Sequence, residues 1–305
     1  MILKSLFNRQ GREDIFVVGE RRLERLKAEG RYSCYRATRA VLRKLSLFRK
    51  GKSLPVNEVT PAMLEEFRLF LALDQGNSNN TIVENLKVVL LLLEEGGASR
   101  DIRSEIKLSR EQTPRTYLLE SELERLMALD VKVDSLAAVA RDIFFVECRT
   151  GLRISDLLLL KWESCQNNMI RLRMQKTQRW IEVPMSTQVR CVLEKYRTLF
   201  SQEEDYVFPL MAGPVDEAND FSISRKVVSA TVTVNQQVKR LAARAGLEKC
   251  ISTHVGRHTF ATSLLSKGAS IYEIKELLGH CDVKVTQIYA HLRTDRKRAL
   301  IEMLE

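Results

Sequence analysis

The chain has no long hydrophobic run. Its longest uninterrupted apolar stretch, Val88–Leu93, contains six residues, whereas a helix that crosses a membrane needs about 20. Charged residues interrupt the N-terminal segment too early to leave the apolar stretch that a secretory signal peptide needs. We therefore expect no membrane segment and a cytoplasmic location.

Closely spaced cysteines are also missing. The six cysteines are scattered, at Cys34, Cys148, Cys165, Cys191, Cys250 and Cys281, and no two form a C-x-x-C pair. This spacing argues against a zinc site and against a disulfide framework. We expect reduced thiols, mostly buried, and no bound metal. The sequence also has no internal repeat and no low-complexity segment.

The composition is that of a globular protein with an excess of basic residues. A length of 305 residues predicts two domains, each with its own core. Lys and Arg number 49 against 39 Asp and Glu, giving a net charge of +10 and a pI near 9.4. Residues 1–50 hold 14 of these bases and 5 acids. This balance favours a polyanionic partner, with nucleic acid the first candidate; a basic helical protein of another kind stays as an alternative.

The N-terminal third of the chain has a helical pattern. In Tyr32–Lys50, an apolar face is predicted from Ala37, Val41, Leu45 and Phe48. A basic stripe of Arg36, Arg39, Arg43 and Lys50 falls on roughly the opposite face. Such a stripe suits contact with DNA phosphates, and a solvated basic face is the competing interpretation.

Turn residues divide the rest of this third into further helices. Thr60-Pro61 predicts the start of a helix that runs to about Leu73. A second helix is expected over about 81–95 and a short one over 99–106. The polar, Pro-containing segment near 108–115 reads as a linker. We therefore predict a tail at 1–15, an all-α domain at 16–107, the linker, and a second domain at 116–305.

The second domain is predicted to be mostly helical with a small antiparallel sheet. Helices are expected near 120–129, 135–149, 155–162, 186–200 and 232–245. Apolar and polar residues alternate over 170–174 and again over 181–183, which predicts a β-hairpin across Gln175–Gln178. Residues 201–225 are predicted to be irregular, with one short strand at Tyr206–Leu210.

All four histidines, His254, His258, His280 and His291, lie within Thr253–Leu292, together with Arg257 and Tyr289. With Thr253 as a plausible N-cap, His254 and Arg257 project from one helix face near the helix N-terminus. This arrangement favours an anion, phosphate especially. A zinc-binding H-E-x-x-H motif is excluded, because position 255 is Val and Arg257 would repel a cation.

A second cluster lies about a hundred residues upstream. Arg153 follows a helix-ending Gly151, and Asp156 stands three residues later. We expect the Asp156 carboxylate to orient the Arg153 guanidinium. On its own, this pair would be a surface ion pair of little consequence.

Together these segments resemble one family, the tyrosine recombinases or phage integrase family. T-G-L-R-I-S-D-L at 150–157 matches its first arginine box. The segments 254–268, 274–280 and 286–292 match its second box in order and spacing. The resemblance covers about residues 116–305. It implies an α+β tyrosine-recombinase catalytic domain after an N-terminal α-helical core-binding (SAM-like) domain, hence a mainly α protein with a small antiparallel β-sheet.

The resemblance also implies roles for individual residues. Arg153 and Arg257 would grip the scissile phosphate, and Tyr289 would attack it to form a 3′-phosphotyrosyl bond. His254 matches the general base and Lys176 the general acid. Two further residues match supporting positions: His280 as a phosphate donor and Asp156 as an acidic support residue.

Other residues of these segments are expected to be structural. His258 and His291 are assigned to packing or hydrogen bonding, and Trp180 and Phe260 to the core. Gly256 departs from the family, which often has a larger apolar residue there, and is expected to loosen the first helical turn.

The implied reaction is site-specific DNA recombination on double-stranded DNA, as an integrase, invertase or resolvase, without cofactor or metal. Strand exchange between two sites implies a tetramer on DNA, with residues 295–305 as an amphipathic helix that docks on a neighbouring protomer or on its own domain. Two alternatives stay open: relaxation of DNA like a type IB topoisomerase, and a non-catalytic DNA-binding regulator.

Overall fold

The structure, a computed structural model, describes residues 13–98, 101–111, 115–198, 201–212, 219–280 and 282. The chain divides into two compact units. Unit 1 comprises Met1–Thr113 and Val215–Arg225, and unit 2 comprises Pro114–Pro214 and Lys226–Glu305.

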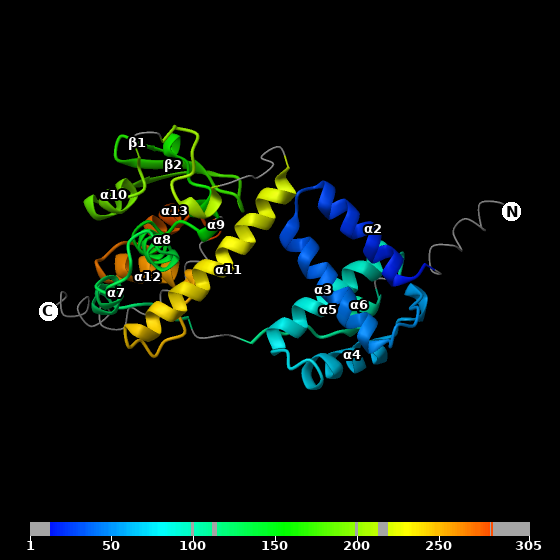
Figure 1. Cartoon of the computed structure of the whole chain (residues 1–305). Helices are drawn as coiled ribbons and strands as arrows, with labels where there is room; N and C mark the ends of the chain where they lie inside the picture. Colours follow the sequence, from blue (N-terminus) through cyan, green and yellow to red (C-terminus); the bar gives the residue numbers. More distant parts are fainter. Residues whose placement is uncertain are drawn as a thin grey trace. The chain divides into compact units, whose positions relative to one another are not determined.

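Apart from an isolated bridge between Asp14 and Pro55, the regular elements in the described part of unit 1 are all helical. Its elements are α2 (Ile15–Ala28), α3 (Tyr32–Phe48), a 3₁₀ turn at Val56–Glu58, α4 (Pro61–Leu73), α5 (Asn79–Glu95), α6 (Asp101–Glu105) and the start of α11 (Asp220–Arg244) (Figure 1). One core built mainly of Leu, Val and Ile side chains joins α2 to α5. The prediction of a helical N-terminal domain is confirmed.

Side-chain caps explain where two of these helices begin. Asp14 caps α2 by accepting from Phe16 N at 2.8 Å, and its other oxygen accepts from Leu54 N at 2.8 Å. Thr60 caps α4 by accepting from Met63 N at 3.2 Å, with Pro61 in the first turn. The predicted start of α4 is therefore confirmed, since a threonine cap followed by proline favours helix initiation.

The amphipathic pattern of α3 was predicted with one error. Val41 and Leu45 are buried as expected, but Ala37 is exposed and Thr38 is buried in its place. Helix α3 packs against Gly19 of α2 through Leu42, which rotates the buried face toward Thr38. The four basic residues of the predicted stripe, Arg36, Arg39, Arg43 and Lys50, are all exposed. Lys50 lies just past the helix with a φ of 52°.

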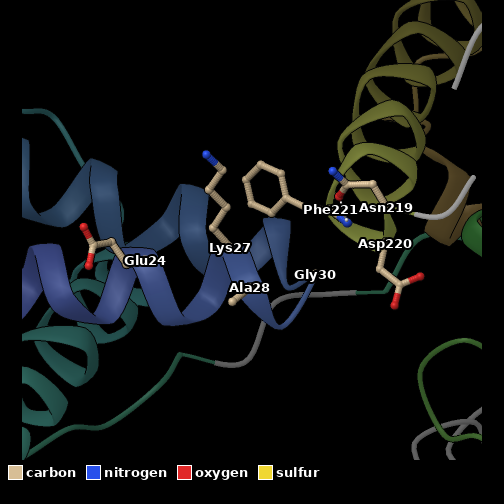
Figure 2. A pocket seen from close by; sticks show the side chains of 7 residues that line it. All are labelled: Glu24, Lys27, Ala28, Gly30, Asn219, Asp220 and Phe221. Atoms are coloured by element: carbon tan, nitrogen blue, oxygen red, sulfur yellow. Dashed lines mark hydrogen bonds between the residues drawn. The ribbon is translucent and has the colours of Figure 1, made fainter. Parts of the chain in front are cut away.

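Unit 1 also includes a segment from far along the sequence, Val215–Arg225. Phe221 contacts the rings of Tyr32 and Tyr35 edge-on, with centroids 5.1 and 5.2 Å away. Beside this cluster lies an open pocket of about 640 Å³. Figure 2 shows the residues that line it: Glu24, Lys27, Ala28, Gly30, Asn219, Asp220 and Phe221.

Residues 107–111, which include the first half of the predicted linker, are tied to unit 1. Arg68 donates to Lys107 O at 2.9 Å, and Asn79 donates to Ser109 O at 3.1 Å. Asn80 accepts from Glu111 N at 3.0 Å and donates to Glu111 O at 3.1 Å. The asparagines in the first turn of α5 thus bind the backbone that follows α6.

Unit 2 combines helices with one small sheet. Its helices are α7 (Glu120–Met127), α8 (Leu136–Thr150), α9 (Ile154–Leu158), α10 (Thr187–Glu194), the larger part of α11, α12 (Thr253–Ser266) and α13 (Ile271–Leu278), with 3₁₀ turns at Trp162–Ser164 and Pro209–Met211. Its strands are β1 (Cys165–Gln166), β2 (Met169–Arg173) and β3 (Trp180–Pro184) (Figure 1). The predicted class, mainly α with a small antiparallel sheet, is confirmed.

The sheet has the strand order β1-β2-β3 and is antiparallel throughout. Ile170 pairs with Val183 and Leu172 with Ile181, so the buried residues of the predicted hairpin share one face. Trp180 alternates with Ile181 and therefore points outward, 69% exposed. The prediction that Trp180 belongs to the core is wrong. The short strand β1 was not predicted.

Segment 201–225 differs from its prediction in two respects. Tyr206 forms only an isolated bridge with Lys161, and Pro209–Met211 is a 3₁₀ turn rather than a strand. Helix α11 begins at Asp220 instead of near 232. Its first half is rich in Ser, Thr and Val, which have low helix propensity and concealed this extension.

The thiols are less buried than predicted. Of the five described cysteines, all free thiols, only Cys148 is buried, so the prediction of mostly buried thiols is wrong. Cys191 and Cys250 are exposed. Among the described helices, none has the length and apolar content needed to cross a membrane.

Candidate active site

The first arginine box, residues 150–157 with Arg153, begins where α8 meets α12. Gly151 ends α8 with a φ of 67°, a left-handed conformation that favours glycine. A Cβ at this position would come within 2.4 Å of the Phe260 ring, because α12 packs directly on the turn. Phe260 is 8% exposed and joins a small core with α13, as predicted. Arg153 follows as the N-cap of α9.

Arg257 ties three elements together. It lies on α12, 8% exposed, and its guanidinium donates to Gly151 O and to Leu278 O, the latter at 2.5 Å. These carbonyls stand at the C-terminal ends of α8 and α13, where helices carry partial negative charge. The arginine is therefore held in place by backbone carbonyl groups from both arginine boxes.

Arg153 faces the turn end of the β2–β3 hairpin. Its Nη1 lies 3.1 Å from the sulfur of Met174, a residue only 1% exposed. Met174 also fills the space beside Gly279, where a Cβ would approach its methyl carbon within 2.2 Å. One methionine thus separates Arg153 from the turn that precedes His280.

Asp156 has a different partner from the one expected. Its Oδ1 accepts from the backbone N–H of Gln175 at 2.9 Å, so the carboxylate holds the hairpin turn rather than bonding the Arg153 guanidinium. Burial raises the pKa of Asp156, against the opposing effects of the Gln175 N–H and of Arg153. Lys176, the next residue in the turn, is exposed. Asp156 therefore connects the arginine cluster to the position of Lys176.

His254 lies in the first turn of α12, whose N-cap is Ser252 rather than Thr253. Thr253 instead donates its backbone N–H to Asn235 Oδ1 at 2.9 Å. Partial desolvation of the imidazole, followed by the charges of Arg257 and Lys176, lowers the pKa of His254. A neutral imidazole can accept a proton.

His280 follows the left-handed Gly279 that ends α13. Burial and then the charges of Arg257 and Arg153 lower its pKa to about 4. At neutral pH this imidazole is uncharged, so it can offer one N–H donor to an anion while adding no charge.

One residue near these groups escaped sequence-based reasoning. Arg115 precedes the first helix of unit 2, and its Nη1 lies 3.4 Å from His258 Nε2. Burial and then the Arg115 charge lower the pKa of His258 to about 4, and Arg115 also lowers those of His254 and His280. No motif marks Arg115, because it belongs to the polar segment predicted as linker.

The structure thus brings together five of the six residues predicted to be catalytic: Arg153, Lys176, His254, Arg257 and His280. Tyr289, and with it His291, lies outside the described residues. No group of His, Cys, Asp and Glu that could hold a metal ion occurs in the part of the chain that the structure describes. Three arginines and a lysine beside neutral imidazoles form a positive site suited to a phosphodiester.

The phage integrase family matches residues 116–296, and the phage integrase SAM-like domain matches residues 14–100. The tyrosine recombinase XerD of Lacticaseibacillus casei is 31% identical over 215 residues, which cover 68% of this chain and 69% of that protein. Other relatives that carry the name XerD are matched over 48% to 78% of their own length.

Solved structures show a similar fold. The Tn1549 transposon integrase in complex with a circular intermediate DNA superposes with a TM-score of 0.67 at 19% identity, over 94% of this chain and 99% of that chain. The lambda integrase tetramer bound to a Holliday junction gives a TM-score of 0.65 at 18% identity, over 94% of this chain and 80% of that chain.

Proposed function

Because this chain belongs to the phage integrase family, the tyrosine recombinases, we propose that it cuts and rejoins DNA strands through a covalent 3′-phosphotyrosyl intermediate. The chain is an enzyme of site-specific DNA recombination. The observation that carries the proposed chemistry is the joining of both arginine segments by Arg257, whose guanidinium binds Gly151 O and Leu278 O.

The phosphate is held by guanidinium groups. Arg153 and Arg257 would donate to the non-bridging oxygens of the scissile phosphate, with His280 as a neutral donor. Arginine suits this role because its planar fork stays charged and donates to two oxygens at once. As negative charge develops on these oxygens, fixed donors stabilise the transition state more than the ground state.

Tyr289 is the proposed nucleophile. Its phenolic oxygen would attack phosphorus, and the proton would pass to His254, whose lowered pKa keeps the imidazole neutral at neutral pH. The bond from phosphorus to the 5′ oxygen then breaks. Attack on the phosphotyrosyl bond by another 5′-hydroxyl reverses these steps, so the energy of the DNA ester is conserved.

The leaving oxygen needs a proton, and Lys176 is the proposed general acid. Asp156 positions it indirectly, since the Asp156 carboxylate accepts from the backbone N–H of the preceding residue, Gln175. This contact makes the placement of Lys176 depend on the same short helix, α9, whose N-cap is Arg153.

The SAM-like domain is proposed to bind double-stranded DNA through α3, which presents the exposed residues Arg36, Arg39 and Arg43, with Lys50 just beyond the helix. We propose domain limits of 16–107 for the SAM-like domain and 116–305 for the catalytic domain. We also propose that the protein recombines DNA in the cytoplasm.

Replacing Arg36, Arg39 and Arg43 together by Ala should weaken DNA binding and its salt dependence. Each lost phosphate contact lowers the slope of log K against log salt by about 0.9, so three contacts predict a loss of about 2.7. Binding measured over a salt series checks this. A matched control replaces Arg21, Lys87 and Arg103, exposed bases that each pair with a glutamate. Equal loss of slope in both triple variants contradicts the proposal for α3.

We also propose assembly as a tetramer on DNA, because exchange between two sites needs four cleaved strands. This proposal draws on the lambda integrase tetramer on a Holliday junction, which shares the fold. The proposed docking helix, 295–305, lies outside the described residues.

Recombination and simple relaxation predict different products. Inverted repeats near the gene would first be footprinted with the purified protein to define its site. A supercoiled plasmid with two such sites should then yield deletion or inversion products, while a plasmid without sites stays supercoiled. Relaxation of the plasmid without sites, and no recombinants from the other, would instead support a type IB topoisomerase. No change in either plasmid would support a non-catalytic regulator.

A further inference from the structure

A buried carboxyl group lies directly behind the proposed phosphate site. Glu147, on the last turn of α8, is only 1% exposed. The backbone N–H of Ile154, the residue after Arg153, donates to its carboxyl group, and the charge of Arg257 acts on that group. The oxygen Oε2 has no hydrogen-bond partner among the described residues. Glu147 therefore touches the segments that carry both arginines.

The space for this carboxyl group is provided by Gly256 on α12. A Cβ at position 256 would approach Glu147 Oε2 within 2.8 Å and Glu147 Cγ within 3.1 Å. It would also lie 3.2 Å from the Phe144 ring. Since helices α8 and α12 pack against each other here, a larger residue at 256 would displace Glu147 or separate the helices.

Glu147 cannot serve as an ordinary counter-ion. An ionised glutamate would compete with phosphate for Arg257 and cancel part of its charge. Burial raises the pKa of Glu147 well above its usual range, against the opposing effects of Arg257 on α12 and of the Ile154 N–H. On its own helix, the neighbouring ionisable group is the buried thiol of Cys148. A neutral acid can still accept from Ile154 and fill the space beside Gly256.

We propose that Glu147 is a positioning residue: its carboxyl group links the backbone after Arg153 to the helix that carries Arg257, and Gly256 provides the space it occupies. The proposal rests on the proposed function only in that the two arginines act on one phosphate. Glu147 itself does not touch DNA. Its effect is to fix the distance between two guanidinium groups that must engage the same phosphate at once.

The test is single-turnover cleavage of a nicked suicide DNA substrate carrying the footprinted site, with DNA affinity and thermal unfolding measured for each variant. Glu147→Ala should slow formation of the covalent adduct about a hundredfold, as expected for misplaced groups, with nearly unchanged DNA affinity. Glu147→Gln has the shape of the neutral acid and should restore a rate close to that of the wild type.

Gly256→Ala supplies the second half of a double-mutant cycle. In the presence of Glu147, the added methyl group should slow cleavage. In the Glu147→Ala background it should cause a much smaller loss, because the colliding carboxyl group is gone and only the 3.2 Å approach to the Phe144 ring remains. A rate for Glu147→Gln as low as that of Glu147→Ala in folded proteins, or the same loss from Gly256→Ala in both backgrounds, overturns the inference. If the wild type itself forms no adduct, the proposed function fails instead.

Discussion

Replacing Arg257 by Ala should lower the rate of DNA cleavage by about a hundredfold to a thousandfold. This is the usual effect of removing one fixed hydrogen-bond donor to an oxygen on which negative charge develops. DNA affinity should change little, because binding draws on many phosphate contacts and cleavage on this one. Single-turnover formation of the protein–DNA adduct and a gel-shift titration measure the two effects separately.

The same substitution should also reduce stability. Arg257 is buried and donates to Gly151 O and Leu278 O, so its removal leaves two carbonyl groups without these donors. An unsatisfied buried polar group costs about 1–3 kcal/mol. Arg257→Lys keeps the charge but cannot reproduce both contacts, and we expect it to recover part of the stability and little of the rate.

Arg190 offers a matched control for Arg257. It lies in the same unit, on α10, and its guanidinium bonds Asn168 and Thr187 at the surface. Arg190→Ala removes the same charge and should leave the cleavage rate unchanged. An Arg257→Ala protein that folds and cleaves at the wild-type rate would contradict the role proposed for Arg257.

Local signals explain why the elements around the site could be predicted. Thr60-Pro61 and Gly151 mark helix ends through capping and left-handed backbone, which depend on few neighbours. The hairpin follows from strict alternation of Ile170 and Leu172 with arginines. Matching of separate motifs then indicated that Arg153, His254 and Arg257 belong to one site, although about a hundred residues separate the first from the others.

Contacts between distant segments explain what could not be predicted. Glu147 reads as one polar residue within an apolar helix, and only the packing of α12 shows that Gly256 accommodates it. Arg115 stands in a polar segment without periodicity, so nothing in the sequence relates it to His258. The partner of Asp156 was missed because Gln175 contributes a backbone N–H, which no side-chain pattern reveals.

Periodicity also determines a face only when the partner surface is known. Aromatic character suggested that Trp180 is buried, yet the neighbouring Ile181 and Val183 take the inward positions of β3 and leave Trp180 exposed. On α3, Thr38 is buried where the periodicity predicted Ala37, because α3 packs against α2. In both cases the sequence indicated the element and the tertiary packing selected its face.

The role proposed for Tyr289 rests on family membership and on the order of the motifs, because the residue lies outside the described part of the chain. Phenylalanine lacks only the hydroxyl group, so Tyr289→Phe removes the proposed nucleophile with little change in shape. Tyr272, 71% exposed on α13, also lies within the sequence segment Thr253–Leu292. Its replacement by phenylalanine is a matched control for the loss of a tyrosine hydroxyl group.

The most direct measurement is the covalent adduct itself. Incubated with a nicked suicide substrate and then denatured, the wild type and Tyr272→Phe should both give a protein–DNA band, and mass mapping should locate the DNA on Tyr289. Tyr289→Phe should give no band while binding the substrate with unchanged affinity. An adduct that persists in Tyr289→Phe, or that maps to another residue, would contradict the account.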